Sequence, residues 1–142
     1  MDSNIIYVTQ VSKNKAILEF KNMKYDAYIG ENGTSESKRE GDKKTPLGEY
    51  ALGLCFGIHE KKYLNLDESL EYKKLTNTMY WVSDSNSKYY NRFVDTKEIE
   101  KDWNADEHLI DYTIEYEYAI EVKYNKACIP NKGSAIFIHC EN

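Results

Sequence analysis

The sequence predicts a mostly β fold with one or two short helices, and three observations lead to this class. A chain of 142 residues with 41% hydrophobic residues is long enough for one core, so a single domain spanning 1–142 is expected. Thirteen tyrosines accompany only seven glycines and two prolines, which is typical of a globular chain and not of a fibrous or disordered one. Several short runs of β-branched and aromatic residues alternate with polar turn residues, as in sheet proteins.

The first third of the chain contains the earliest predicted strands. Residues 5–8 (IIYV) and 16–20 (AILEF) are separated by a polar turn, and residues 25–29 form a third candidate strand. Residues 30–42 are polar and punctuated by glycine, which predicts a loop. A further strand-like stretch follows at 50–54.

The middle of the chain alternates between loops, one strand and one candidate helix. Residues 61–74 show no sustained helical stripe and are predicted to be a loop with short elements. Residues 79–82 (MYWV) predict a strand, and residues 89–95 an aromatic-rich surface segment. Residues 96–103 predict a short helix with Thr96 as its N-cap.

Two more strands are predicted near the end of the sequence. Residues 116–124 (YEYAIEVKY) alternate almost strictly, which predicts a half-buried strand with Tyr118, Ile120 and Val122 on one face. Residues 135–139 are almost entirely apolar, which predicts a fully buried strand.

Charge and hydropathy restrict the partners. The formal net charge is −5 with no block of Lys or Arg, so neither nucleic acid nor a basic membrane-binding face is expected. No apolar run approaches the roughly eighteen residues of a membrane span, and the start carries no signal peptide, so the chain taken literally is cytoplasmic. Small molecules, peptides or glycans are the expected partners.

The cysteines and histidines are the candidate reactive groups. Three cysteines without CxxC spacing predict no disulfide framework and no zinc site, and neither a metal nor a cofactor is expected. His59 is interpreted as a structural or surface residue, and His108, beside two carboxylates, as a pocket wall or a helix cap with equal weight. His139 ends an apolar strand, where a scaffold presents side chains to a cleft. Cys140 follows it, but consecutive strand residues point to opposite faces, so Cys140 is interpreted as a small buried residue.

Four stretches, taken together, resemble a known family. Residues 41–50 (GDKKTPLGEY) are similar to the "GDxxTPxGxY" signature of YkuD-type L,D-transpeptidases, and residues 28–33 precede it as they do there. Three later stretches resemble, in the same order, the "SxYYN", "W-x-x-x-E-H-L" and "GSAIF-x-H" motifs of a bacterial branch of the family: residues 87–91, 103–109 and 133–140. Four ordered matches make the resemblance more specific than one motif would.

The resemblance implies a β-sandwich domain and a cell-wall activity. Members of the family cut a peptidoglycan tetrapeptide stem, hold the acyl group as a cysteine thioester, and pass it to an amine of a neighbouring stem in the cell envelope. His139 occupies the position of the family's general base. The family's nucleophile lies in a "[ST]-x-G-C" motif a dozen or more residues further on, and the present sequence ends before it.

Three hypotheses follow. The first is a truncated or frame-interrupted L,D-transpeptidase that lacks its C-terminal part and is inactive alone. The second is a stem-peptide-binding module without catalysis, and the third a divergent acyltransferase with Cys140 as nucleophile. In each case the strand 135–138 is expected to lie at an exposed sheet edge that favours self-association.

Candidate substrate-binding residues come from the aromatic side chains and one histidine. Trp81 and Tyr90 are candidates for an aromatic wall along the stem peptide, although core positions are the default for aromatic residues in such a tyrosine-rich chain. His108 is the remaining candidate.

Overall fold

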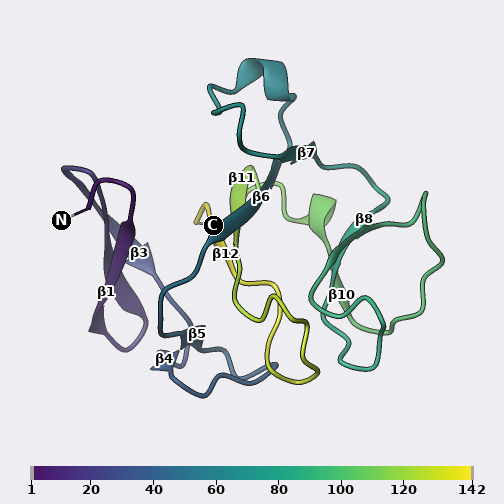
Figure 1. Cartoon of the computed structure of the whole chain (residues 1–142), viewed down its shortest axis with the longest axis horizontal. Coiled ribbons are helices and arrows are strands. Elements are labelled where there is room, and N and C mark those ends of the chain that lie inside the picture. The colour runs from purple at the N-terminus through teal and green to yellow at the C-terminus, as the bar shows by residue number, and fades with distance from the viewer. Residues whose placement is uncertain (1, 142) are drawn as a thin grey trace. The chain divides into compact units, whose positions relative to one another are not determined.

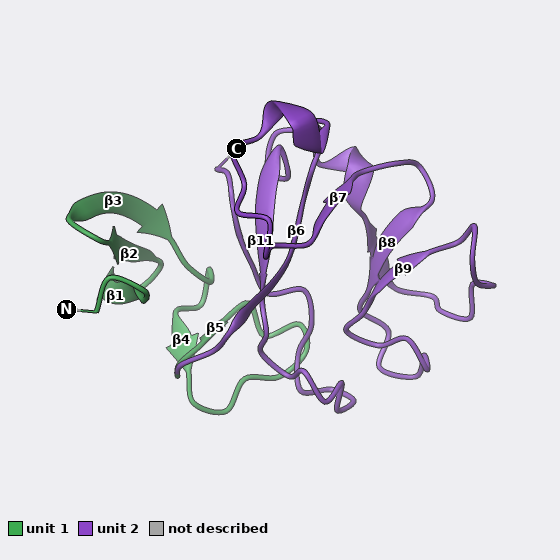
Figure 2. Ribbon diagram, turned by 45° about the horizontal axis from the view of Figure 1, so that its top comes forward, with its two compact units in different colours: residues 1–48 green, residues 49–142 purple. Residues whose placement is uncertain are grey.

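The computed structural model describes residues 2–141, and the chain divides into two compact units, residues 1–48 and 49–142 (Figure 2). The prediction of a mostly β fold is confirmed: strands dominate both units (Figure 1). Within residues 2–141 the helices are two 3-10 turns, η1 (Lys61–Tyr63) and η2 (Leu109–Asp111). That the chain forms a single domain stays a prediction.

The first unit is built on a three-stranded antiparallel sheet. Its strands, β1 (Ile6–Ser12), β2 (Lys15–Phe20) and β3 (Met23–Tyr28), lie in sequence order and confirm the three strands predicted there. Short turns join the strands because each hydrophobic run is followed by polar residues or by Lys21, which has a φ of 55°. The predicted loop after β3 contains β4 (Thr34–Ser35), which pairs in parallel with β5 (Thr45–Pro46).

The second unit holds two sheets. One has the order β12-β11-β6-β7, formed by β6 (Leu52–Gly57), β7 (Tyr72–Lys74), β11 (Tyr118–Val122) and β12 (Phe137–His139). The other has the order β10-β8-β9, formed by β8 (Met79–Val82), β9 (Phe93–Asp95) and β10 (Asp106–His108). The strand predicted at 79–82 is thus confirmed at its predicted bounds.

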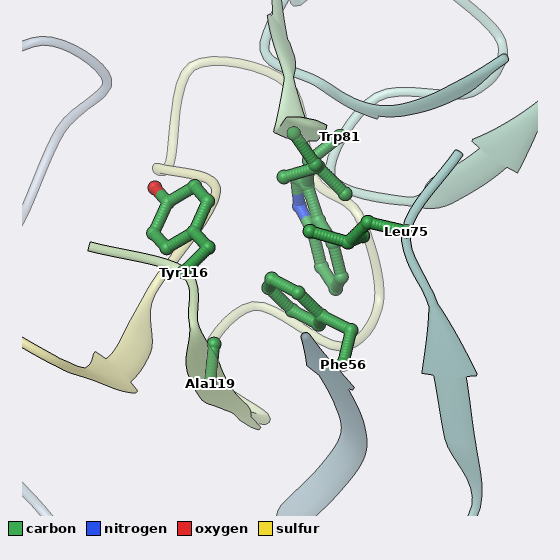
Figure 3. Packing of buried hydrophobic residues seen from close by; sticks show 6 residues of the cluster. Phe56, Leu75, Trp81, Tyr116 and Ala119 are labelled. Carbon is green, nitrogen blue, oxygen red and sulfur yellow. The ribbon is translucent and has the colours of Figure 1, made fainter. Parts of the chain in front are cut away.

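An aromatic core lies in this second unit. Figure 3 shows Phe56, Leu75, Trp81, Tyr116 and Ala119 gathered from separate strands and loops. The Phe56 and Tyr116 rings meet edge to face, with centroids 5.6 Å apart. Such contacts add to the burial of apolar area, so the core is held by rings from segments far apart in sequence.

Two local predictions in the middle of the chain are wrong. Residues 96–103 form turns and a bend instead of a helix, because the Asp95 carboxylate accepts the Lys97 N–H and so stabilises a local turn. Residues 89–95 are not a surface segment: Tyr90 and Val94 are buried, and the segment ends in β9.

Two predictions near the end of the sequence also need correction. The strand within 116–124 exists as β11, but Ala119 faces the core and Tyr118 is 49% exposed. The strand within 135–139 is the three-residue β12, which is half-buried and ends in the exposed His139, so it is not fully buried. It lies at the edge of its sheet, where one side of its backbone lacks a neighbouring strand of the described residues.

Candidate functional site

His139 lies at the end of β12, and its ring is fixed on one side. Its register partner on β11 is Ala119, and its imidazole meets the Tyr116 ring edge to face, with centroids 5.3 Å apart. The His139 Nδ1 lies 2.7 Å from the backbone oxygen of Cys140, which accepts its hydrogen. In the neutral ring this arrangement leaves the lone pair on Nε2. Within residues 2–141 nothing is hydrogen-bonded to this Nε2, so the exposed imidazole is suited to accept a proton there.

Phe137 anchors β12 against the core two residues earlier. Its ring centroid lies 4.8 Å from that of Trp81 and 5.1 Å from that of Phe56. Because residues i and i+2 of a strand share a face, this packing places His139 on the same face as Tyr116.

Tyr116 connects His139 to a carboxylate. The Tyr116 hydroxyl donates a hydrogen bond to Glu107 Oε1 at 2.5 Å. Burial, and then the neighbouring Glu107 carboxylate, raise the pKa of Tyr116 well above its ordinary value. The phenol therefore stays protonated, and the ring that supports His139 is held from its far end.

Cys140 does not pair with the His139 ring. Its N–H donates to Glu115 O at 3.0 Å, and its Sγ lies 3.7 Å from Tyr118 O. Within residues 2–141 no cysteine thiol forms a hydrogen bond with the His139 imidazole. The neighbours in sequence are therefore not a nucleophile and its base in this arrangement.

The other two thiols are free but differently placed. Cys55 is 6% exposed, and burial raises the pKa of its thiol, so its thiolate is disfavoured. Cys128 is half-buried in the connection between β11 and β12, with its Sγ 3.8 Å from Asn91 O.

The three candidate substrate-binding residues already have partners within the chain. Trp81 and Tyr90 are each 2% exposed, so they are core residues in this structure and not an open aromatic wall. His108 is bonded at both ring nitrogens, Nδ1 to Asp111 Oδ2 at 3.0 Å and Nε2 to Asn77 O at 2.7 Å. Its ring also stacks on Tyr80 at 4.7 Å, which makes it a fixed connector between β10 and the turn before β8.

Two of the four motifs, which lie more than 40 residues apart in the sequence, meet in the second unit. Asn91, from the SKYYN stretch, accepts the Trp81 Nε1–H at 3.0 Å and the Ala135 N–H at 3.2 Å through its Oδ1. The neighbouring Tyr90 hydroxyl accepts the Gly133 N–H at 2.9 Å. The SKYYN stretch therefore binds the GSAIF stretch that leads into His139.

The GDKKTP stretch has a structural role within the first unit. The Asp42 carboxylate accepts three hydrogen bonds. The Lys38 ammonium and the Arg39 N–H donate at 2.8 Å, and the Lys44 N–H donates at 2.9 Å. Burial opposes ionisation of Asp42, but these donors together lower its pKa. Thr45 Oγ1 accepts a hydrogen bond from the Gly30 N–H at 2.7 Å, which joins the GDKKTP stretch to the preceding stretch, residues 28–33.

Sequence reasoning missed three residues of this arrangement: Glu107, Tyr116 and Asn91. Glu107 and Asn91 belong to the motifs that resemble the family, but the motifs indicated no role for either residue. Tyr116 lies outside the motifs, and nothing in the sequence distinguished it from the other tyrosines.

Another imidazole–carboxylate pair lies where β6 ends and β11 begins. His59 Nε2 and Glu117 Oε2 are 2.8 Å apart, and the His59 ring packs against Tyr118 with centroids 5.3 Å apart. Both side chains are substantially exposed, and the pair contributes little to stability.

Residues 2–141 contain no group of three or more histidines, cysteines or carboxylates arranged to hold a metal ion. Within the same residues no helix is long and apolar enough to cross a bilayer.

Comparison with protein-family models, with curated proteins and with solved structures finds no match for this chain.

Proposed function

We propose that the second unit carries an L,D-transpeptidase-like site that recognises a peptidoglycan stem peptide, with His139 in the position of the family's general base. The observation that carries the proposal is the contact between motifs: Asn91 and Tyr90 bind Ala135 and Gly133, on the segment that leads into His139. The resemblance rests on sequence, so the contact between two of its stretches is an independent observation that supports the proposal. The same proposal includes a β-sandwich of L,D-transpeptidase type as the fold.

The chemistry asks for a base with a free lone pair. In the acyl transfer that the alternative requires, the Cys140 thiol proton would move to His139 Nε2, and the thiolate would add to a carbonyl carbon of the stem. The peptide C–N bond breaks, the leaving amine takes the proton, and a thioester remains. An amine of a neighbouring stem then displaces the cysteine sulfur. The hydrogen bond from Nδ1 to Cys140 O supports the required tautomer.

The positions of the thiols favour stem-peptide binding over acyl transfer by the cysteines of this chain. Cys140 Sγ contacts Tyr118 O, and Cys55 is buried with a raised pKa. We therefore propose that this chain recognises the stem peptide without being acylated, and acylation of Cys140 is the alternative.

A titration with a synthetic tetrapeptide stem tests recognition. The chain is labelled with ¹⁵N on histidine, and the ring resonances of His139, His108 and His59 are followed by NMR. The His139 resonance is expected to shift saturably, and a stem with inverted stereochemistry at its third residue serves as the matched ligand control. Absence of saturable shifts, or equal shifts with both ligands, would contradict the proposal.

Mass spectrometry after incubation with a carbapenem tests acylation separately. We expect no adduct on Cys55, Cys128 or Cys140 under conditions that acylate an active L,D-transpeptidase. An adduct on Cys140 that disappears in His139→Ala would instead establish the alternative, with Cys140 as nucleophile.

A further inference from the structure

The position of β12 along β11 is not set by a tight turn. Fourteen residues, 123–136, connect Val122 at the end of β11 to Phe137 at the start of β12. A two-residue hairpin fixes the register of its strands, whereas a long connection does not. Another device must therefore place the three-residue β12.

Packing of Phe137 explains only part of this register. Because its ring sits among Phe56, Trp81 and Tyr116, a slip of one residue would expel it from the core and is disfavoured. A slip of two residues keeps every side chain on its face. It would move Phe137 out of its ring contacts and His139 by about 7 Å along β11 and away from Tyr116, so the packing of Phe137 opposes this slip together with the hydrogen bonds of the connection.

Asn91 binds both ends of the connection. Its Nδ2 donates to Tyr124 O at 3.2 Å and to Asn125 O at 2.9 Å, just after β11. Its Oδ1 accepts from Ala135 N–H at 3.2 Å, just before β12. One amide thus joins the exit of one strand to the entry of the next, and uses its donors and acceptor fully.

The Asn91 side chain is itself rigidly held. Its backbone N–H donates to Val82 O at 2.9 Å, and its φ of 56° is a left-handed conformation that Asn tolerates better than most residues. The indole of Trp81 adds a bond to the same Oδ1 from within the core. The Asn91 amide therefore fixes the position of the connection relative to the β8–β9 pair.

We propose that Asn91 sets the position of β12 along β11 and is thereby the positioning residue of His139. Asn125 fixes the interior of the connection, through bonds from its Nδ2 to Ile129 O and Gly133 O, but these bonds stay within the loop. The role in register is independent of ligand binding, and its meaning for the stem-peptide site rests on the proposed function.

Asn91→Asp and Asn91→Gly test this role. The Asp variant keeps the acceptor and loses the two donors, and the Gly variant keeps the left-handed backbone and loses the side chain. Asn131→Asp is the matched control, because Asn131 has a φ of 65° in the same connection but binds Ser85 through its backbone N–H. The readouts are the NOE between the Tyr116 and His139 rings and hydrogen exchange at Val122 and Cys140, whose N–H groups bond across the strands.

In both Asn91 variants the Tyr116–His139 NOE is expected to weaken or vanish, and exchange at Val122 to accelerate by about tenfold or more. Amides of β8 and β9 should keep their protection, which separates a register change from unfolding. If NOE and exchange in both variants match the Asn131→Asp control, the proposal is wrong. A failed stem-peptide titration of the unmodified chain would remove the proposed function and leave this result standing.

Discussion

The two units of the molecule use apolar side chains in opposite ways. In residues 1–48 the strands β1, β2 and β3 have six or seven residues and pair along their length with one register shift, between Gln10 and Ser12, and within these three strands Ala16 is the buried residue. Residues 49–142 form shorter and less regular strands around buried rings such as Phe56, Trp81 and Tyr116. Regular strand pairing and a packed core are therefore separable outcomes in this chain.

The difference follows from how many apolar side chains each unit buries. In the first unit the register puts Val8, Leu18 and Tyr25 on one face, and Val8 and Tyr25 are 49% and 48% exposed. The strands of that sheet pair along their length although few of their side chains are buried. In the second unit rings from distant segments exclude water together, and the backbone follows their packing.

Loss of a core ring should show the contrast most strongly. Phe56→Ala is expected to lower the free energy of unfolding by about 3–5 kcal/mol, because it removes a fully buried ring and leaves a cavity. Phe20→Ala in β2, where the ring is 37% exposed, should cost roughly 1 kcal/mol. Urea unfolding followed by circular dichroism measures both variants. Equal losses would abolish the distinction between the units.

Close backbone contact is the next largest expected effect, and it lies in the first unit. A Cβ on Gly30 would lie 2.5 Å from Lys43 O and 2.7 Å from Thr45 N, so Gly30→Ala should cost about 1–3 kcal/mol. Gly41→Ala is the control: apart from its chain neighbours, no heavy atom of the described residues lies within 4 Å of the added Cβ. The φ of 78° opposes the change, at about 1 kcal/mol. A larger loss for Gly41→Ala would contradict the packing argument.

Removal of the Tyr116 hydroxyl tests how much its hydrogen bond to Glu107 stabilises the second unit. Tyr116→Phe is expected to cost about 2 kcal/mol, because Glu107 loses a donor beside the core. The raised pKa of Tyr116 means that this contribution is complete below about pH 10 and falls as the pH rises further. Unfolding of both proteins at pH 8 and above pH 10 measures it, with the exposed Tyr118→Phe as the neutral control.

The smallest expected effect concerns the loop of the first unit. Asp42→Asn should cost about 1 kcal/mol, because the carboxylate accepts three hydrogen bonds and its pKa is lowered. The sign is fixed: the contribution is present above about pH 4 and is lost as the pH falls through the lowered pKa. The difference between the two proteins should therefore close in acid. Asp26→Asn, on the exposed β3, is the control for loss of a carboxylate and should leave the free energy of unfolding at neutral pH almost unchanged.

Local pattern predicted several elements correctly and failed where side chains act at a distance. The strands of the first unit and β8 follow from alternation and composition alone. The helix expected at 96–103 failed because Asp95 caps a turn and Trp103 donates its indole N–H to Asp106 at 2.6 Å. For β11, the register shift between Ile120 and Val122 breaks the single alternating face that the sequence indicated.

The candidate site divides in the same way. The sequence singled out His139 and separated it from Cys140 by strand alternation, and the structure places the Cys140 thiol against Tyr118 O. It offered no means of finding Tyr116 beside His139, or of removing Trp81 and Tyr90 to the core. Those features depend on which segments pack together.

By itself the sequence determined the β class, most strand positions and the order of the motifs, because alternation and turn chemistry act over a few neighbouring residues. Only the tertiary structure decided that Asn91 meets Ala135 and that Tyr116 supports His139. Such contacts join residues dozens of positions apart, and they form only when the shared burial of many rings outweighs the entropy of closing the intervening chain.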